Sequence, residues 1–60
     1  MKVLVNYDDG HDYGSFEYFS QFNRINAKGI KDEIRDQIVR RYGYNRSRYI
    51  EVTGWYRIDD

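Results

Sequence analysis

The chain of 60 residues contains no cysteine, no proline and no long apolar run. The absence of cysteine excludes disulfides and thiolate metal sites, and it is compatible with a reducing cytosol. Met1-Lys2 is followed by three apolar residues, Val3–Val5, which are too few for a membrane span or for the core of a signal peptide. We therefore expect a soluble cytoplasmic protein without a targeting segment.

Neither sign of charge is in excess, because ten basic residues balance ten acidic ones. A neutral chain has no overall field that would attract nucleic acid. The charges are nevertheless separated along the sequence, since acidic residues predominate up to Asn23 and basic residues predominate from Arg24 to Ile58. The chain is therefore acidic first and basic later.

Aromatic residues are abundant, with seven Tyr, three Phe and one Trp. We expect residues 1–60 to form a single compact domain, whose core is too small to bury all of these rings. Several rings must then lie at the surface or in an interface. This predicts a homodimer or a higher homo-oligomer.

The stretch from Asn26 to Gly43 predicts an amphipathic helix. Ile30, Ile34 and Ile38 recur at every fourth position, which places them on one helical face. Asn26 can cap the first turn, and Gly43 can adopt the left-handed conformation that ends a helix. This helix would bury one face and expose the other.

Three further segments predict β-strands, namely Lys2–Tyr7, Phe16–Phe22 and Arg48–Ile58. Phe16–Phe22 could also form a helix capped by Ser15, but its aromatic content and the turn-forming residues before it favour a strand. In the last segment Gly54 marks either a bulge or the tip of a hairpin, and we expect one bent strand.

This order predicts an α+β fold, a small ββαβ domain whose helix packs on one face of a three-stranded antiparallel sheet of order 2-1-3. The first strand lies in the middle because it has apolar residues on both faces. The uncovered face is expected to carry Leu4, Phe19 and Trp55, an exposed apolar patch of the kind that mediates association.

The polar cluster Asp8, Asp9, His11 and Asp12 could bind a divalent cation or position a general base. Its spacing does not match a calcium loop, and Asp and Gly are the residues that turns select. The sequence also lacks phosphate-binding glycine loops, paired histidine ligands and nucleophile elbows. We therefore expect a solvated turn and no catalytic residue, metal site or cofactor, so the protein is not expected to be an enzyme.

A second cluster alternates arginine with tyrosine between Arg40 and Tyr49. Arginine forms bidentate contacts with carboxylate or phosphate, and tyrosine offers a ring for packing or base stacking. A purely structural role, with arginines capping the helix end, is weighted equally with these binding roles. The candidate binding residues are Arg40, Arg41, Tyr44, Arg46, Arg48, Tyr49 and Trp55.

The leading hypothesis is a small non-enzymatic interaction protein that self-associates and binds a protein partner through this tyrosine and arginine surface. The size of the chain alone suggests a phage or mobile-element product that inhibits a host machine. The alternative is a small nucleic-acid-binding protein, with phosphate contacts from arginine and base stacking on Tyr44, Tyr49 or Trp55.

Overall fold

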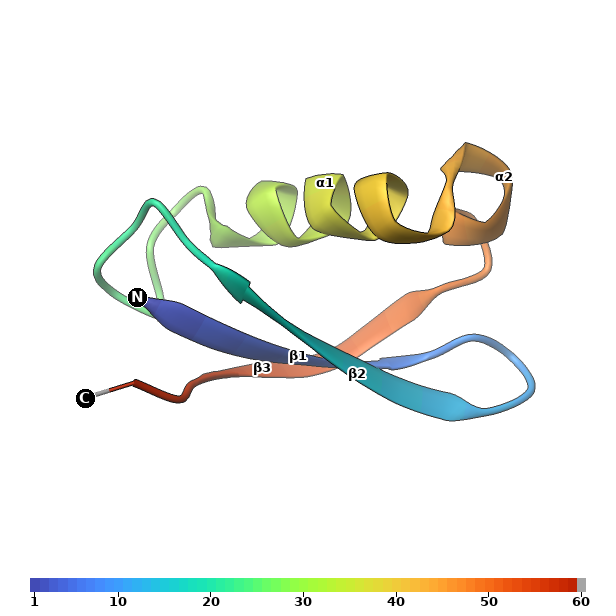
Figure 1. Ribbon diagram of the computed structural model, residues 1–60, viewed down its shortest axis with the longest axis horizontal. Helices are drawn as coiled ribbons and strands as arrows, with labels where there is room; N and C mark the ends of the chain where they lie inside the picture. Colours follow the sequence, from blue (N-terminus) through green and yellow to red (C-terminus); the bar gives the residue numbers. More distant parts are fainter. Residues whose placement is uncertain (60) are drawn as a thin grey trace.

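The computed structural model describes residues 1–59, which form one layer of sheet and one layer of helix (Figure 1). The elements are β1 (Lys2–Asp8), β2 (Tyr13–Phe19), α1 (Ile30–Tyr42), α2 (Tyr44–Ser47) and β3 (Glu51–Arg57). The strands form an antiparallel sheet of order β2-β1-β3. The predicted α+β fold, its element order and its sheet order are therefore confirmed.

The central strand β1 alternates buried and half-buried residues. Val3, Val5 and Tyr7 point toward α1, and Val3 and Val5 are completely buried. On β2, Phe16 pairs with Val5 and Tyr18 pairs with Val3, so these rings lie on the same face. Phe16 and Tyr18 thus extend the floor on which α1 packs, and the strand assignment for this segment is confirmed, although β2 begins and ends three residues earlier than predicted.

The helix α1 begins at Ile30, so its predicted start at Asn26 is wrong. The preceding segment instead forms two successive turns, with hydrogen bonds from Ala27 N to Arg24 O and from Ile30 N to Ala27 O, both 3.1 Å. The ring of Phe22 packs so closely on Gly29 that a Cβ there would lie 2.8 Å from it. The turns end at Gly29, which is the N-cap of α1 and a residue of low helix propensity.

The end of α1 agrees with the sequence. The helix stops after Tyr42, and Gly43 follows with a positive φ of 86°. The four residues after Gly43 form the single helical turn α2. Its last residue, Ser47, is buried, and its hydroxyl donates to Tyr44 O at 2.8 Å.

The strand β3 is one bent strand, as predicted, and it contains a bulge. Val52 pairs with Tyr7 and Gly54 pairs with Asn6, so Thr53 is the additional residue. One additional residue inverts the alternation of side chains beyond it. Trp55 consequently lies opposite Val5 on the face covered by α1, and the prediction that Trp55 lies on the uncovered face is wrong.

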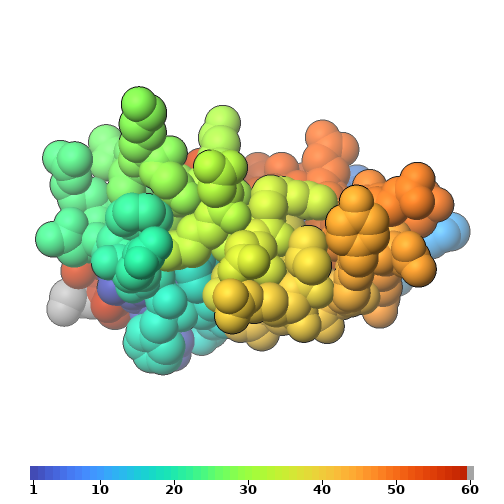
Figure 2. Space-filling model, turned by 90° about the horizontal axis from the view of Figure 1, so that it is seen from above, coloured from blue at the N-terminus to red at the C-terminus, as the bar shows by residue number. Residues whose placement is uncertain are grey.

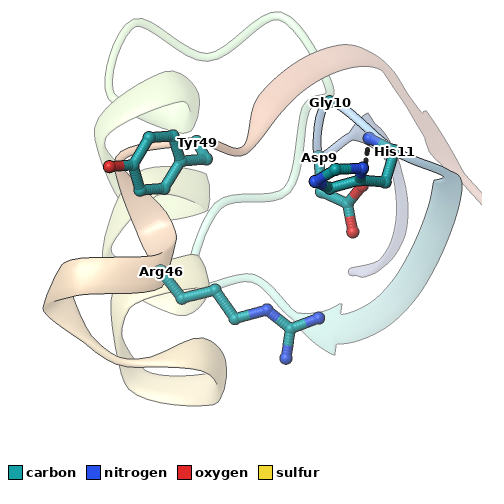
Figure 3. Close-up of a pocket in the computed structure, with 5 residues that line it drawn as sticks. All are labelled: Asp9, Gly10, His11, Arg46 and Tyr49. Carbon is teal, nitrogen blue, oxygen red and sulfur yellow. Dashed lines mark hydrogen bonds between the residues drawn. The ribbon is translucent and has the colours of Figure 1, made fainter.

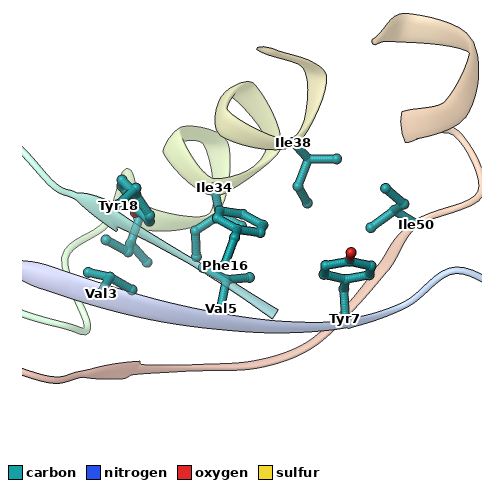
Figure 4. Close-up of a cluster of buried hydrophobic side chains, with 9 residues drawn as sticks. Val3, Val5, Tyr7, Phe16, Tyr18, Ile34, Ile38 and Ile50 are labelled. Carbon is teal, nitrogen blue, oxygen red and sulfur yellow. The ribbon is translucent and has the colours of Figure 1, made fainter. Parts of the chain in front are cut away.

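The core lies between the sheet and α1 (Figure 4). Ile34 and Ile38 are at most 1% exposed, and they point from α1 toward the buried residues of β1 and β2 (Figure 4). Each such side chain stabilises the fold by about 1.5–3 kcal/mol relative to an exposed position. The full core consists of Val3, Val5, Tyr7, Phe16, Tyr18, Ile30, Ile34, Ile38 and Ile50.

Polar side chains of α1 connect it to β2, α2 and the segment before β3. Near its start, Glu33 accepts a hydrogen bond from the Tyr18 hydroxyl at 2.7 Å. Further along, the Arg35 guanidinium donates to Ile50 O at 2.7 Å and to Ser47 O at 2.9 Å, which fixes α2 and the start of β3. The molecule is elongated, with extents of 32 × 18 × 16 Å. Neither helix within residues 1–59 is long and apolar enough to cross a membrane.

Candidate functional site

A cleft lies at one end of the molecule, between the β1–β2 turn and α2. The antiparallel sheet brings these segments together, because β1 ends where β3 begins and Asp8 pairs with Glu51. Seen from the helix side, the blue atoms of the turn emerge beyond the orange atoms that follow α1 (Figure 2). The cleft has a volume of about 410 Å³, within the range of small-ligand sites. We call it the α2 cleft, and it is lined by Asp9, Gly10, His11, Arg46 and Tyr49 (Figure 3).

The first wall of the α2 cleft is the turn, and its carboxylates hold the backbone in place. Asp9 Oδ1 accepts from His11 N at 2.9 Å and from Asp12 N at 2.8 Å. Asp8 Oδ1 accepts from Gly10 N at 2.8 Å. The hydrogen bonds from the backbone of Asp12 and His11 lower the pKa of Asp9, and the positive charge of Arg46 also contributes. Asp9 is therefore a fixed negative charge at neutral pH.

The cluster of Asp8, Asp9, His11 and Asp12 has the hydrogen bonding of a turn. No group of three or more histidine or carboxylate side chains within residues 1–59 is placed to hold a metal ion.

The second wall of the α2 cleft is formed by Arg46 of α2 and by Tyr49, which is 68% exposed. The Arg46 guanidinium lies 5.5 Å from the centroid of the Tyr42 ring, a cation–π contact. Within the described part of the chain it makes no hydrogen bond and no ion pair. Its side chain extends from α2 toward the turn side of the cleft (Figure 3). Arg46 can therefore bind an acidic group without losing a hydrogen bond or an ion pair.

Tyr44 and Arg48 flank the α2 cleft without lining it. Tyr44 is 75% exposed, and the Arg48 guanidinium lies 6.0 Å from the centroid of the Tyr49 ring. Together with Arg46 and Tyr49, they form an exposed surface of two arginines and two tyrosines at this end of the molecule. Four of the seven predicted binding residues are thus gathered here.

The other three candidates have internal partners elsewhere. Arg40 Nε lies 2.8 Å from Asp36 Oδ2, one helical turn earlier. Arg41 covers the Phe16 ring at 4.7 Å and donates to Glu17 O at 2.6 Å. Trp55 is half-buried, and its indole N–H donates to Ile25 O at 3.3 Å. These side chains do not line the α2 cleft.

Sequence reasoning treated the acidic turn and the arginine–tyrosine segment as separate clusters and missed their proximity. The predicted topology contained the necessary information. In a sheet of order 2-1-3 with antiparallel neighbours, the last residues of the first strand and the first residues of the third lie at the same end of the sheet. The turn after the first strand therefore meets the connection before the third.

A second surface lies on the uncovered face of the sheet, opposite α1 (Figure 1). Alternation along the strands places Leu4, Phe19, Tyr56 and Ile58 there, at the end nearest the termini. Phe19 is 77% exposed and Tyr56 is 56% exposed. Lys2 and Glu17 lie among these side chains and form an ion pair of 3.1 Å. We call these six residues the open-face patch.

No protein-family model, no curated protein and no solved structure matches this chain. A function for the α2 cleft has therefore to follow from the chemistry of its side chains.

Proposed function

We propose that this protein is a non-enzymatic interaction module that binds a segment of a partner protein in the α2 cleft. The observation that carries this proposal is the placement of the Arg46 guanidinium, which makes no hydrogen bond or ion pair within residues 1–59, opposite the fixed carboxylate of Asp9 on the other wall. Arginine and tyrosine are the residue types that contribute most to protein interfaces. The cleft thus offers a group for an acidic side chain, a group for a basic side chain and a ring for apolar contact.

This charge arrangement favours a polypeptide over a nucleic acid as the occupant. A nucleic acid presents closely spaced phosphates of one sign, and the wall opposite Arg46 carries Asp9, with Asp8 and Asp12 next to it in the same acidic segment. These carboxylates would repel a backbone that runs across the cleft. A peptide that carries both an acidic and a basic residue complements both walls.

The proposal also includes self-association of the module. Exposed aromatic and aliphatic side chains on the open-face patch support it, because a large apolar patch on a small protein commonly marks an interface.

The α2 cleft can be tested with a random peptide library displayed on phage and selected on the immobilised wild-type protein. We expect enriched peptides to contain an acidic and a basic residue. Arg46→Glu should weaken their binding at least about tenfold, because it replaces the group that receives the acidic residue with a repulsive one. Binding is measured by titration of each synthetic peptide against the purified variants.

Arg24→Glu provides the matched control, because Arg24 is exposed in the loop before α1, at the opposite end of the molecule (Figure 1). Peptides that bind Arg46→Glu as tightly as the wild type would contradict the proposal. A second contradicting result has two parts. The library yields no enriched peptide, and the protein instead binds single-stranded oligonucleotides with an affinity that falls steeply with salt and weakens in Arg46→Ala.

A further inference from the structure

The open-face patch combines apolar side chains with an internally neutralised pair of charges. Two rows of residues cross the strands, one formed by Phe19, Lys2 and Ile58 and the next by Glu17, Leu4 and Tyr56. Within residues 1–59, no helix covers this face (Figure 1). The Lys2 ammonium lies 3.1 Å from Glu17 Oε1 and 5.8 Å from the centroid of the Phe19 ring.

The charge of the patch restricts its partner. Because Lys2 and Glu17 are already paired, the patch can be covered without leaving an unpaired charge. A strongly acidic or strongly basic partner gains no net electrostatic attraction from the patch. A second copy of the same patch is also apolar and neutral, and a two-fold axis allows Lys2 of each copy to approach Glu17 of the other.

The two edge strands of the sheet, β2 and β3, are poorly suited to pairing with a second copy of the chain. Ser20 N donates to Met1 O, so the backbone groups of Ser20 face β1. Backbone groups alternate in direction along a strand, so those of Glu17, three residues earlier, face away from β1. Arg41 occupies the outward carbonyl of Glu17. The other edge strand, β3, contains the bulge at Thr53. Charged side chains and bulges are both features that hinder pairing between edges.

We propose that the open-face patch is the contact surface between two copies of this chain, packed face to face about a two-fold axis near Leu4. This inference rests on the self-association in the proposed function and names its surface and its partner. In this arrangement Phe19, Tyr56 and Ile58 of one copy pack on the same patch of the other.

The size of the face limits the area that this contact can bury. The whole face, three strands of seven residues, measures roughly 14 Å by 23 Å at standard strand spacings, and the open-face patch is the part of it nearest the termini. The buried area per copy is then several hundred Å², below the value of about 800 Å² in a standard interface. The dimer is therefore reversible, with a dissociation constant in the micromolar range or weaker.

Sedimentation velocity from low micromolar to millimolar concentration tests this inference. The wild-type mass should rise from one copy to two across this range. Phe19→Ser and Tyr56→Ser should each raise the dissociation constant about tenfold or more, because each removes a ring from the contact. Both rings are more than half exposed, so the variants should retain the wild-type circular dichroism spectrum.

Tyr44→Ser is the matched control, because Tyr44 is as exposed as Phe19 and lies on α2, on the other side of the sheet. A wild type that stays monomeric at every concentration would overturn the inference. An unchanged dissociation constant in both patch variants, or an equal loss in Tyr44→Ser, would also overturn it. Peptide binding in the α2 cleft is measured separately in Phe19→Ser, which should lose dimer formation and keep peptide binding. Failure of one proposal can therefore be distinguished from failure of the other.

Discussion

At the scale of single residues, Glu33 connects α1 to the end of β2. Its two carboxylate oxygens accept from the Tyr18 hydroxyl at 2.7 Å and from Gln21 N at 3.2 Å. Partial burial raises the pKa of Glu33, but hydrogen bonding by Ser20, Tyr18 and the Gln21 amide, with the positive N-terminus, outweighs it. The pKa of Glu33 therefore lies below its ordinary value.

This depressed pKa predicts a pH-dependent contribution to stability. A carboxyl group whose pKa is lower in the folded state stabilises the fold above its unfolded pKa, near 4.5, and loses that contribution as the pH falls through the folded value. Glu33→Gln should cost about 1 kcal/mol at neutral pH, since the carboxylate is only partly buried, and progressively less in acid. Urea unfolding at several pH values measures this difference. Asp32→Asn, one residue earlier and exposed, is the matched control, because it leaves the hydrogen bonds from Tyr18 and Gln21 to Glu33 intact.

At the scale of elements, the stability of α1 depends on its buried isoleucines. Ile38 is completely buried, so Ile38→Val should cost about 1 kcal/mol through the lost methylene and the space it leaves. In a domain of this size the melting temperature would fall by roughly 4–8 °C. Val39→Ala, at the adjacent exposed position, should change the melting temperature far less. Equal losses at the two positions would contradict the assigned buried face.

The outer edge of β2 depends on Arg41 in a different way. Its guanidinium hydrogen bonds the outward carbonyl of Glu17 and covers the Phe16 ring. Arg41→Ala should free this edge for pairing with another chain and increase light scattering at high concentration. Because edge pairing does not use the open-face patch, the increase should persist when Phe19→Ser is added. Arg40→Ala is the control, since Arg40 pairs with Asp36 of its own helix. Similar scattering in both variants would argue against an edge effect.

The elements also show how far the sequence determines the structure. The period of Ile30, Ile34 and Ile38 was sufficient to predict α1 and its buried face, and Gly43 predicted its end. Asn26 suggested an earlier cap, but Gly29, a residue of low helix propensity, is the N-cap of α1, and the Phe22 ring packs against it. Likewise, Gly54 indicated a bulge. The bulge exchanges the sheet faces on which Trp55 and Tyr56 lie, and this exchange follows only when the pairing with β1 is counted residue by residue.

The candidate site was predictable to a similar degree. Arg46 and Tyr49 belong to a segment whose composition indicated binding, and the structure leaves both exposed. The pair between Arg40 and Asp36 follows from their i, i+4 spacing on one helix. The engagement of Arg41 could not be predicted, because a flexible arginine side chain chooses among several acceptors at close distance. The sheet order alone was sufficient to place the acidic turn beside Arg46.

At the scale of the whole molecule, the α2 cleft and the open-face patch lie on different sides of the sheet and toward opposite ends (Figure 1). Occupation of one surface therefore leaves the other accessible. Two copies joined through their sheets would present two identical clefts on one rigid particle. Against a target that repeats its recognition segment, the second engagement becomes intramolecular and can raise the apparent affinity by about 10²–10⁴ without any new contact. A small module whose single cleft binds weakly would then discriminate between targets by the number of recognition segments they carry as well as by their sequence.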